Sequence, residues 1–254
     1  MCGGKGVSLL FDPYVPLPGA AYEMLAEGFL PAPHILITHG HVDHVGSVPD
    51  ILEQGAGEVY ATASPCAGLL EQGVLQEKLQ VIEPGAVLSL GDTPEVEKVL
   101  VTVKRGKHIH FDIPLVLGTL LHPRMLRYWG NAKALVKANR IFQENDETVI
   151  YEVSDGTKLV TVLGSLSLND EEHYTQNPNL LILPYQGSSH LLPIALSIVE
   201  QLAPQSVLLD HFDDAFPPVS RTIDTSPFVE AMAQQHPEIP VIIPQRGSCY
   251  EVQR

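Results

Sequence analysis

The chain has 254 residues, of which 44% are hydrophobic and 18% are charged, so its composition indicates a globular protein rather than a disordered one. Its formal net charge of −15 at pH 7 disfavours a general nucleic-acid binder, and no apolar run is long enough for a membrane-spanning helix. The first residues lack the apolar stretch of a secretory signal, and three cysteines cannot all pair. We therefore expect a reduced, cytoplasmic protein without nucleic-acid or membrane partners.

Short apolar runs alternate with helix-like segments along most of the chain. In the first half, strands are predicted at residues 7–11, 34–38, 58–61 and 96–104, and helices at 48–54 and 66–72. In the second half, strands are predicted at residues 149–153, 159–163, 180–183, 207–209 and 241–243, and helices at 191–202 and 227–235. This alternation predicts an α/β fold in which two halves, at about 1–115 and 147–254, form a single domain over residues 1–254.

A basic, helix-like insertion at about residues 116–146 separates the two halves. Residues 98–140 hold nine basic side chains and one acidic side chain, a balance of +8 in a chain of −15. The insertion is either a helical cover with solvated cations, or a lid whose cations, Arg124 and Arg127 among them, attract anionic substrates. Its Trp129, the chain's only tryptophan, would line a pocket, pin the insertion to the core or join a contact in a homo-oligomer.

Four potential metal ligands follow the predicted strand at 34–38 within six residues. They are His39, His41, Asp43 and His44, with Gly40 between the first two. Neutral imidazole and carboxylate groups are good ligands for zinc and similar divalent ions. We expect Gly40 to let the backbone turn so that the flanking imidazoles converge. The pattern therefore predicts a metal site on the loop after this strand.

This H-x-H-x-D-H spacing resembles the metallo-β-lactamase fold superfamily, and the chain is most similar to its lactonase-like branch, the relatives of L-ascorbate-6-phosphate lactonase. The resemblance covers roughly residues 7–250. It implies a four-layer αββα sandwich of two mixed β-sheets, with the site at the sheet edge where strand-end loops meet. It also implies that His39 and His41 hold one divalent ion, and that Asp43 and His44 hold a second.

The resemblance also implies where the remaining ligands lie. A histidine expected after a strand is His108, with His110 as the alternative, and a histidine expected at a later strand end is His211. Asp12 matches the early structural aspartate of the superfamily. One or two ions would bind, zinc foremost, with manganese or iron as alternatives.

One position departs from the superfamily pattern. Where an aspartate usually bridges the two ions, this chain carries Ser165, and a neutral hydroxyl is a poor zinc ligand. Asp213 or Asp214 would then compensate as an additional ligand. Ser165 is also a candidate to line the substrate pocket.

Residues 183–190 have two interpretations. They follow a predicted strand and precede a predicted helix, so their backbone amides would contact an anionic substrate and His190 would line the pocket. The alternative is an ordinary helix cap formed by Ser188 or Ser189.

These features predict a metal-dependent hydrolase that acts on an ester, lactone or phosphoester of an anionic small molecule. The expected nucleophile is a metal-bound hydroxide, with Asp43 as the group that orients the water and accepts its proton. Two alternatives stay open: a mononuclear iron redox enzyme similar to sulfur dioxygenases, and a metal-binding protein without catalysis.

Overall fold

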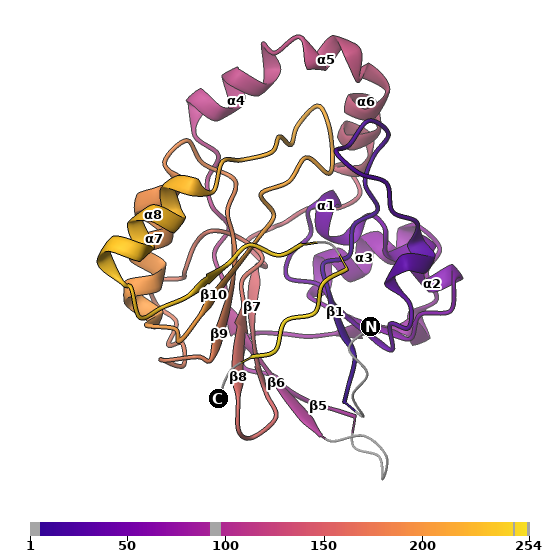
Figure 1. The fold of residues 1–254 in the computed structure, drawn as a ribbon. Coiled ribbons are helices and arrows are strands. Elements are labelled where there is room, and N and C mark those ends of the chain that lie inside the picture. Colours follow the sequence, from indigo (N-terminus) through magenta and orange to yellow (C-terminus); the bar gives the residue numbers. More distant parts are fainter. Residues whose placement is uncertain (1–5, 92–97, 246, 253–254) are drawn as a thin grey trace.

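The computed structural model describes residues 6–91, 98–245 and 247–252, and it contains two sheets with helices on their outer sides (Figure 1). The first sheet has four strands in the order β1-β2-β3-β4. These strands are Leu9–Phe11, His34–Leu36, Glu58–Ala61 and Leu79–Val81. All three pairings are parallel, so the prediction of two mixed sheets is wrong for this sheet. Helices between successive strands make each connection a crossover, which is why the pairing is parallel.

The second sheet has seven strands in the order β11-β10-β9-β8-β7-β6-β5. In chain order, β5 to β11 are Val87–Leu90, Val99–Arg105, Val149–Ser154, Leu159–Val162, Leu180–Pro184, Val207–Asp210 and Val241–Ile242. The pairings are antiparallel from β5 to β8 and parallel from β8 to β11, so this sheet is mixed as predicted. The predicted hairpin turns at Asp155-Gly156 between β7 and β8, where Gly156 has a φ of +89°. Residues 96–97 of the strand predicted at 96–104 lie outside the described residues.

Three hydrophobic cores separate the layers. One packs α7 (Leu191–Leu202) and α8 (Ser226–Gln235) against β9 and β10. A second packs α1 (Val42–Val45), α2 (Val48–Glu53) and α3 (Ala63–Glu71) against β2 and β3. The third lies between the sheets, where Leu36 and Tyr60 of the first meet Val101 and Tyr151 of the second. Three cores in this order define a four-layer αββα sandwich.

The predicted insertion forms an arch of three helices at the top of the molecule (Figure 1). Its helices are α4 (Ile113–Leu120), α5 (Arg124–Arg127) and α6 (Trp129–Ala138). We call residues 113–138 the arch. The arch begins three residues before the predicted boundary because Asp112 caps α4, accepting from the Leu115 N–H over 3.0 Å. Residues after α6 return without helix to β7, so the helical part ends well before the predicted boundary at 146.

Short 3₁₀ turns complete the described elements, at Ala26–Phe29 and Gln76–Lys78. None of the helices in the described part of the chain is long and apolar enough to cross a bilayer. Cys66 is a free, buried thiol.

Candidate metal centre

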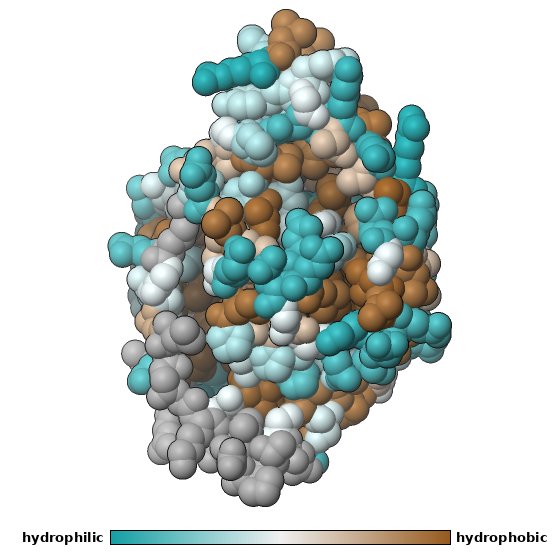
Figure 2. All heavy atoms as spheres, turned by 90° about the vertical axis from the view of Figure 1, so that its right-hand side faces the viewer, coloured by the Kyte–Doolittle hydropathy of each residue, from teal (hydrophilic) through white to brown (hydrophobic). Residues whose placement is uncertain are grey.

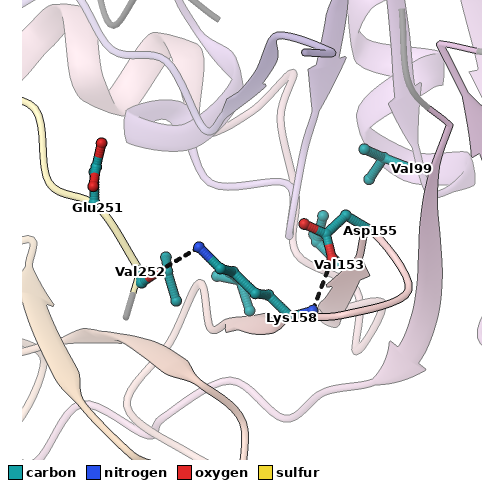
Figure 3. A pocket seen from close by; sticks show the side chains of 7 residues that line it. Val99, Val153, Asp155, Lys158, Glu251 and Val252 are labelled. Carbon is teal, nitrogen blue, oxygen red and sulfur yellow. Dashed lines mark hydrogen bonds between the residues drawn. The ribbon is translucent and has the colours of Figure 1, made fainter. Parts of the chain in front are cut away.

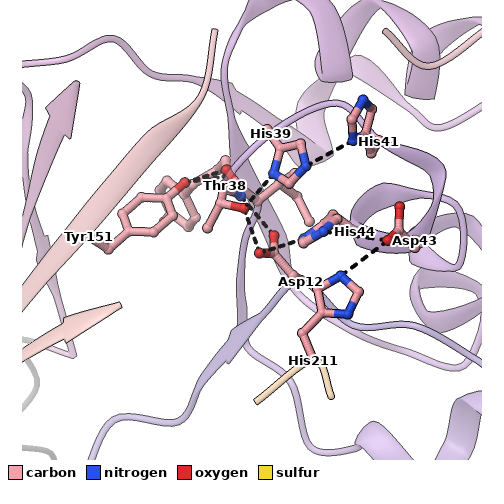
Figure 4. A network of polar contacts seen from close by, with 10 residues as sticks. Asp12, Thr38, His39, His41, Asp43, His44, Tyr151 and His211 are labelled. Atoms are coloured by element: carbon pink, nitrogen blue, oxygen red, sulfur yellow. Dashed lines mark hydrogen bonds and ion pairs between the residues drawn. The ribbon is translucent and has the colours of Figure 1, made fainter. Parts of the chain in front are cut away.

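The predicted ligands lie at the ends of strands from both sheets, on one edge of the sandwich. Asp12 follows β1, His39 and His41 follow β2, and Asp43 and His44 belong to α1. From the second sheet, His108 follows β6 and His211 follows β10. Figure 4 shows the side chains of the first sheet and His211 pointing toward one another.

The first triad consists of His39, His41 and His108. One ring nitrogen from each lies within 4.8 Å of the others, so the three side chains could hold one metal ion. His39 Nε2 is 3.2 Å from His41 Nδ1, and the ring of His108 lies 4.4 Å from that of His41 between centroids. The structure thus brings together the two motif histidines and the favoured candidate from the second sheet.

The protonation of His39 is set by its neighbour. The Thr38 hydroxyl donates to Asp12 Oδ2 over 2.6 Å, so toward His39 Nδ1, 3.0 Å away, it acts as an acceptor. His39 therefore carries its proton on Nδ1 and presents the lone pair of Nε2 to the rest of the first triad. Fixing the tautomer of a ligating histidine in this way is the usual task of groups behind a metal site.

The second triad consists of Asp43, His44 and His211, whose ligand atoms also lie within 4.8 Å of one another. Asp43 Oδ2 is 3.2 Å from His211 Nε2 and 3.7 Å from His44 Nε2. The other nitrogen of His44, Nδ1, lies 2.9 Å from Asp12 Oδ2, at ion-pair distance. Asp12 is thus the common support behind both triads.

The electrostatics of the two triads differ. Burial, and after it the charges of neighbouring imidazoles, lower the pKa of His39. The same two causes lower the pKa of His108 to about 4. Both rings are therefore neutral and able to bind a cation. In the second triad burial would lower the pKa of His44, but Asp12 and Asp43 outweigh it and raise that pKa to about 9. Burial acts against ionisation of Asp43 too, yet His44 and His211 hold its pKa well below the ordinary value. The second triad therefore contains a carboxylate charge that the first triad lacks.

Backbone conformation contributes to the convergence. Asp12 and His211 have φ values of +42° and +55°, a left-handed region that non-glycine residues rarely occupy and that is common at functional sites. Gly40 has no such positive φ; instead, a Cβ there would collide with the carbonyl group of Gln143. Residues 38–40 form a bend, as predicted for Gly40, and the absence of a side chain there also permits the close approach of the Gln143 backbone.

Residues 4–130 match the family model described as the metallo-beta-lactamase superfamily. The chain belongs to the metallo-β-lactamase superfamily. The similarity extends to proteins named UPF0173 metal-dependent hydrolase. One from Pyrobaculum neutrophilum is 30% identical over 46% of this chain and 53% of its own length, and one from Brucella abortus is 28% identical over 96% of this chain and 92% of its own length. The chain thus spans about half the length of the Pyrobaculum relative that it matches.

Solved structures share the fold at low identity. Igni18, a metallo hydrolase from Ignicoccus hospitalis, matches with a TM-score of 0.58 and 15% identity over 94% of this chain and 88% of its own. The isothiocyanate hydrolase from Delia radicum gut bacteria matches with a TM-score of 0.54 and 12% identity over 97% of this chain and 93% of its own. At these identities the likeness concerns the metallo-β-lactamase fold alone.

Ser165, which we predict to occupy the superfamily's bridging position, is buried and hydrogen-bonded. Its Oγ accepts from the N–H of Ile109 over 2.9 Å, next in sequence to the ligand candidate His108. A Cβ at the preceding Gly164 would collide with the Thr38 side chain, so this turn packs directly against the residue that orients His39. Ser165 therefore lies beside the first triad, where it fastens the loop that carries His108.

Other predicted residues lie outside the two triads. His110 is exposed, so His108 is the member of the pair that the structure brings to the site. Asp214 accepts from Arg124 Nη2 over 2.5 Å, and neither it nor Asp213 belongs to a triad. Arg127 is exposed and lies over the Tyr128 ring at 5.3 Å. The suggestion that Asp214 compensates for Ser165 is not supported, because the arch already engages its carboxylate.

The loop at residues 183–190 holds a carboxylate from its own chain. Asp112 Oδ2 accepts from the Ser188 hydroxyl over 2.9 Å, the Ser189 N–H over 2.6 Å and the Ser189 hydroxyl over 2.9 Å. His190 is exposed, and neither Ser188 nor Ser189 caps α7 through its side chain. One of the backbone donors proposed for an anionic substrate, the Ser189 N–H, therefore binds Asp112, and this contact fastens the start of the arch to the body.

Sequence reasoning missed several groups around the triads. Burial and the nearby charge of Asp43 raise the pKa of the Tyr14 phenol. The charge of Glu144 acts to raise the pKa values of His41 and His108, against the effect of burial. Burial raises the pKa of Asp210 to about 7, and its Oδ1 has no hydrogen-bond partner among the described residues. No local motif marks these residues, since each reaches the site through the fold.

A groove at the opposite end of the seven-stranded sheet holds none of the predicted ligands (Figure 3). It runs between the β7–β8 hairpin and the C-terminal segment, where Lys158 donates to the Val252 carbonyl over 2.6 Å. The chemistry-bearing residues of this superfamily member are instead gathered at the triads.

Proposed function

We propose that the chain is a metal-dependent hydrolase that acts on an ester, lactone or phosphoester of an anionic small molecule. The observation that carries the proposal is the pair of triads at one sheet edge of a metallo-β-lactamase superfamily member. The names of the UPF0173 relatives support the class of reaction. One or two divalent ions would be held, zinc foremost, with manganese or iron as alternatives.

The donor chemistry fits such ions. The first triad offers three neutral imidazoles with one tautomer fixed from behind, and the second offers two imidazoles and a carboxylate. Nitrogen and carboxylate ligands in this mixture suit zinc and its neighbours in the first transition series. A divalent ion bound there would lower the pKa of a water molecule and polarise the oxygen of the substrate.

Asp43 is the proposed proton acceptor of the reaction. Its Oδ2 faces His44 and His211, while its low pKa keeps the carboxylate ionised at neutral pH. His39 is held by Thr38 and Asp12, so it stays a neutral ligand and does not compete for the proton. Asp12 therefore supports the reaction without touching the substrate.

The anionic substrate is proposed from the charge around the site. Exposed Arg127 lies on the arch, whereas Arg124 is engaged by Asp214, and Lys107, on the loop that leads to the arch, donates to Asp170 over 3.1 Å. His190 and Ser165 stay candidates for the pocket wall. Attraction of this kind weakens with salt, because the screening length shrinks to about 8 Å at physiological ionic strength.

The test is a panel of esters, lactones and phosphoesters assayed with metal-free protein before and after addition of zinc, manganese or iron. We expect hydrolysis to return with metal and to be absent in His41→Ala, and kcat/KM for an anionic ester to exceed that for its neutral isostere at low salt. Equal values for the isosteres would contradict the anionic substrate. No hydrolysis of any compound by a fully metal-loaded protein would favour a binding protein, and iron in protein purified without added metal would favour the redox alternative.

A further inference from the structure

The arch exposes large hydrophobic side chains to solvent. Of the eighteen such residues exposed in the described part of the chain, nine lie within 26 residues, between Phe111 and Val136. They are Phe111, Ile113, Val116, Leu117, Leu120, Leu121, Leu126, Trp129 and Val136. Contiguous exposure of this kind marks an interaction surface, whereas single exposed hydrophobic residues do not. Figure 2 shows hydrophobic and hydrophilic side chains gathered at the top of the molecule, where the arch lies.

Helix α4 presents its apolar stripe outward. Ile113, Val116, Leu117 and Leu120 recur at the spacing of one helical face, and all four are exposed. None of the residues of α4 is buried, and none carries a charge. An ordinary surface helix turns such a stripe toward the core, so α4 has the opposite orientation.

The arch is nevertheless fastened to the body by polar contacts. Arg221 Nη2 donates to the Gly118 carbonyl over 2.8 Å, and Arg124 pairs with Asp214. Asn131 Nδ2 donates to the carbonyls of Pro18 and Pro217, each over 2.9 Å. These contacts hold three helices in place, so the outward apolar side chains form a preordered surface.

Cations accompany this surface. Arg127, Lys133, Lys137 and Arg140 are exposed on the arch or just after it. The only acidic residue from 98 to 140 is Asp112, whose carboxylate is committed to Ser188 and Ser189. The surface is therefore apolar and positively charged in a chain whose net charge is −15.

We propose that the arch docks onto the surface of an anionic lipid bilayer. Helices that lie in a bilayer interface combine apolar side chains, interfacial tryptophan and lysine or arginine in this way, and cations near an anionic surface add to the attraction. A symmetric dimer through the same surface would set its cations against their copies and is disfavoured. The inference is independent of the hydrolytic reaction, and it revises the sequence-based expectation of no membrane partner.

Trp129 reports on the proposal directly, because it is the only tryptophan of the chain and is 54% exposed. Its fluorescence should shift to shorter wavelength when phosphatidylcholine vesicles containing phosphatidylglycerol are added to the full chain, and vesicles of phosphatidylcholine alone should produce a much smaller shift. Brominated acyl chains should quench the same emission. An unchanged spectrum and no sedimentation with the anionic vesicles would overturn the proposal.

Variants separate the two parts of the surface. The double substitution Leu117→Gln and Leu120→Gln should lower the vesicle partition coefficient roughly tenfold or more, since each side chain is at least half exposed and would be buried on docking. Lys133→Glu with Lys137→Glu should lower it roughly fivefold or more for each cation removed.

The matched control is Leu70→Gln with Leu75→Gln, two leucines that are 45% and 60% exposed outside the arch. It should leave partitioning unchanged. Equal loss of partitioning in control and arch variants would overturn the proposal. So would a wild-type protein that does not bind the vesicles but forms a dimer in light scattering, if the arch variants abolish that dimer.

Discussion

The Thr38 hydroxyl donates to Asp12 Oδ2 over 2.6 Å, while Asp12 Oδ1 accepts from the Thr38 backbone N–H over 2.7 Å. The Asp12 carboxylate thus fixes the end of β2. Its Oδ2, which accepts from the Thr38 hydroxyl, also lies 2.9 Å from His44 Nδ1. A single side chain directly after β1 therefore supports one histidine of each triad. Loss of these contacts should weaken metal binding even though neither Asp12 nor Thr38 belongs to a triad.

Thr38→Val should lower the metal affinity of the first triad about tenfold, because the tautomer of His39 would lose its anchor. The same variant should lower the free energy of unfolding of metal-free protein by about 1 kcal/mol, the usual net value of a lost hydrogen bond. Competition with a metal indicator and urea denaturation give the two values.

Thr38→Ser is the control, since it keeps the hydroxyl and removes only a methyl group. It should retain metal affinity close to that of the wild type. If both variants bound metal equally well, the hydroxyl would have no role in orienting His39.

His108 and His110 provide a matched pair from one loop. His108→Ala should remove a ligand of the first triad and lower bound metal, whereas His110→Ala should bind metal normally because His110 is exposed and outside both triads. Elemental analysis of both proteins, purified identically, makes the measurement. The opposite ranking would reassign the ligand, and circular dichroism spectra would check that both variants remain folded.

Local patterns in the sequence were sufficient to predict the ligand motif and the alternation of strands and helices, and the resemblance to the superfamily supplied the four layers. The apolar run before His39 ends where the ligands begin, and the Asp155-Gly156 turn marks its hairpin without any tertiary information. The first sheet was misjudged because strand direction depends on the crossover connections rather than on the apolar pattern of each strand.

The remainder of the site depends on contacts between distant segments. Asp214 was a suitable ligand by composition, but Arg124, ninety residues away, engages it. Asp112 likewise occupies the N–H of Ser189, one of the loop amides that sequence reasoning offered to a substrate. Pairings across such separations are set by the fold and leave no periodic signal in the chain.

Asp112→Asn should loosen the start of the arch. The N–H groups of Ser189 and Leu115 hold the pKa of Asp112 well below its ordinary value, so the carboxylate is fully ionised at neutral pH and its contacts weaken only as pH falls through that lowered pKa. The neutral amide loses the charge at every pH. Trypsin at neutral pH should therefore cleave the variant faster after Arg124 and Arg127 than it cleaves the wild type.

Asp224→Asn is the control for this prediction, because Asp224 Oδ1 accepts from the Ser226 N–H over 3.0 Å at the start of α8, outside the arch. It should leave cleavage of the arch at the wild-type rate. Equal rates in wild type and Asp112→Asn would show that the contacts of Arg124 and Arg221 are sufficient to hold the arch.

The last prediction concerns Ser165, which we propose to occupy the position where superfamily members usually carry a bridging aspartate. Two cations held close together repel each other, and a bridging anion offsets that repulsion. Without it, we expect one ion to bind tightly and a second to bind weakly. The second triad should be the tighter site, because Asp43 supplies a negative charge that the imidazoles of the first triad do not.

Ser165→Asp should then strengthen the weaker site and raise the metal-to-protein ratio. Ser165→Asn has the same shape without the charge, so it should leave the ratio unchanged. Metal titration of all three proteins under identical conditions provides the measurement. Two equally tight sites in the wild type would show that another group bridges the ions. A gain in Ser165→Asn equal to that in Ser165→Asp would show that side-chain size, rather than charge, limits the second ion.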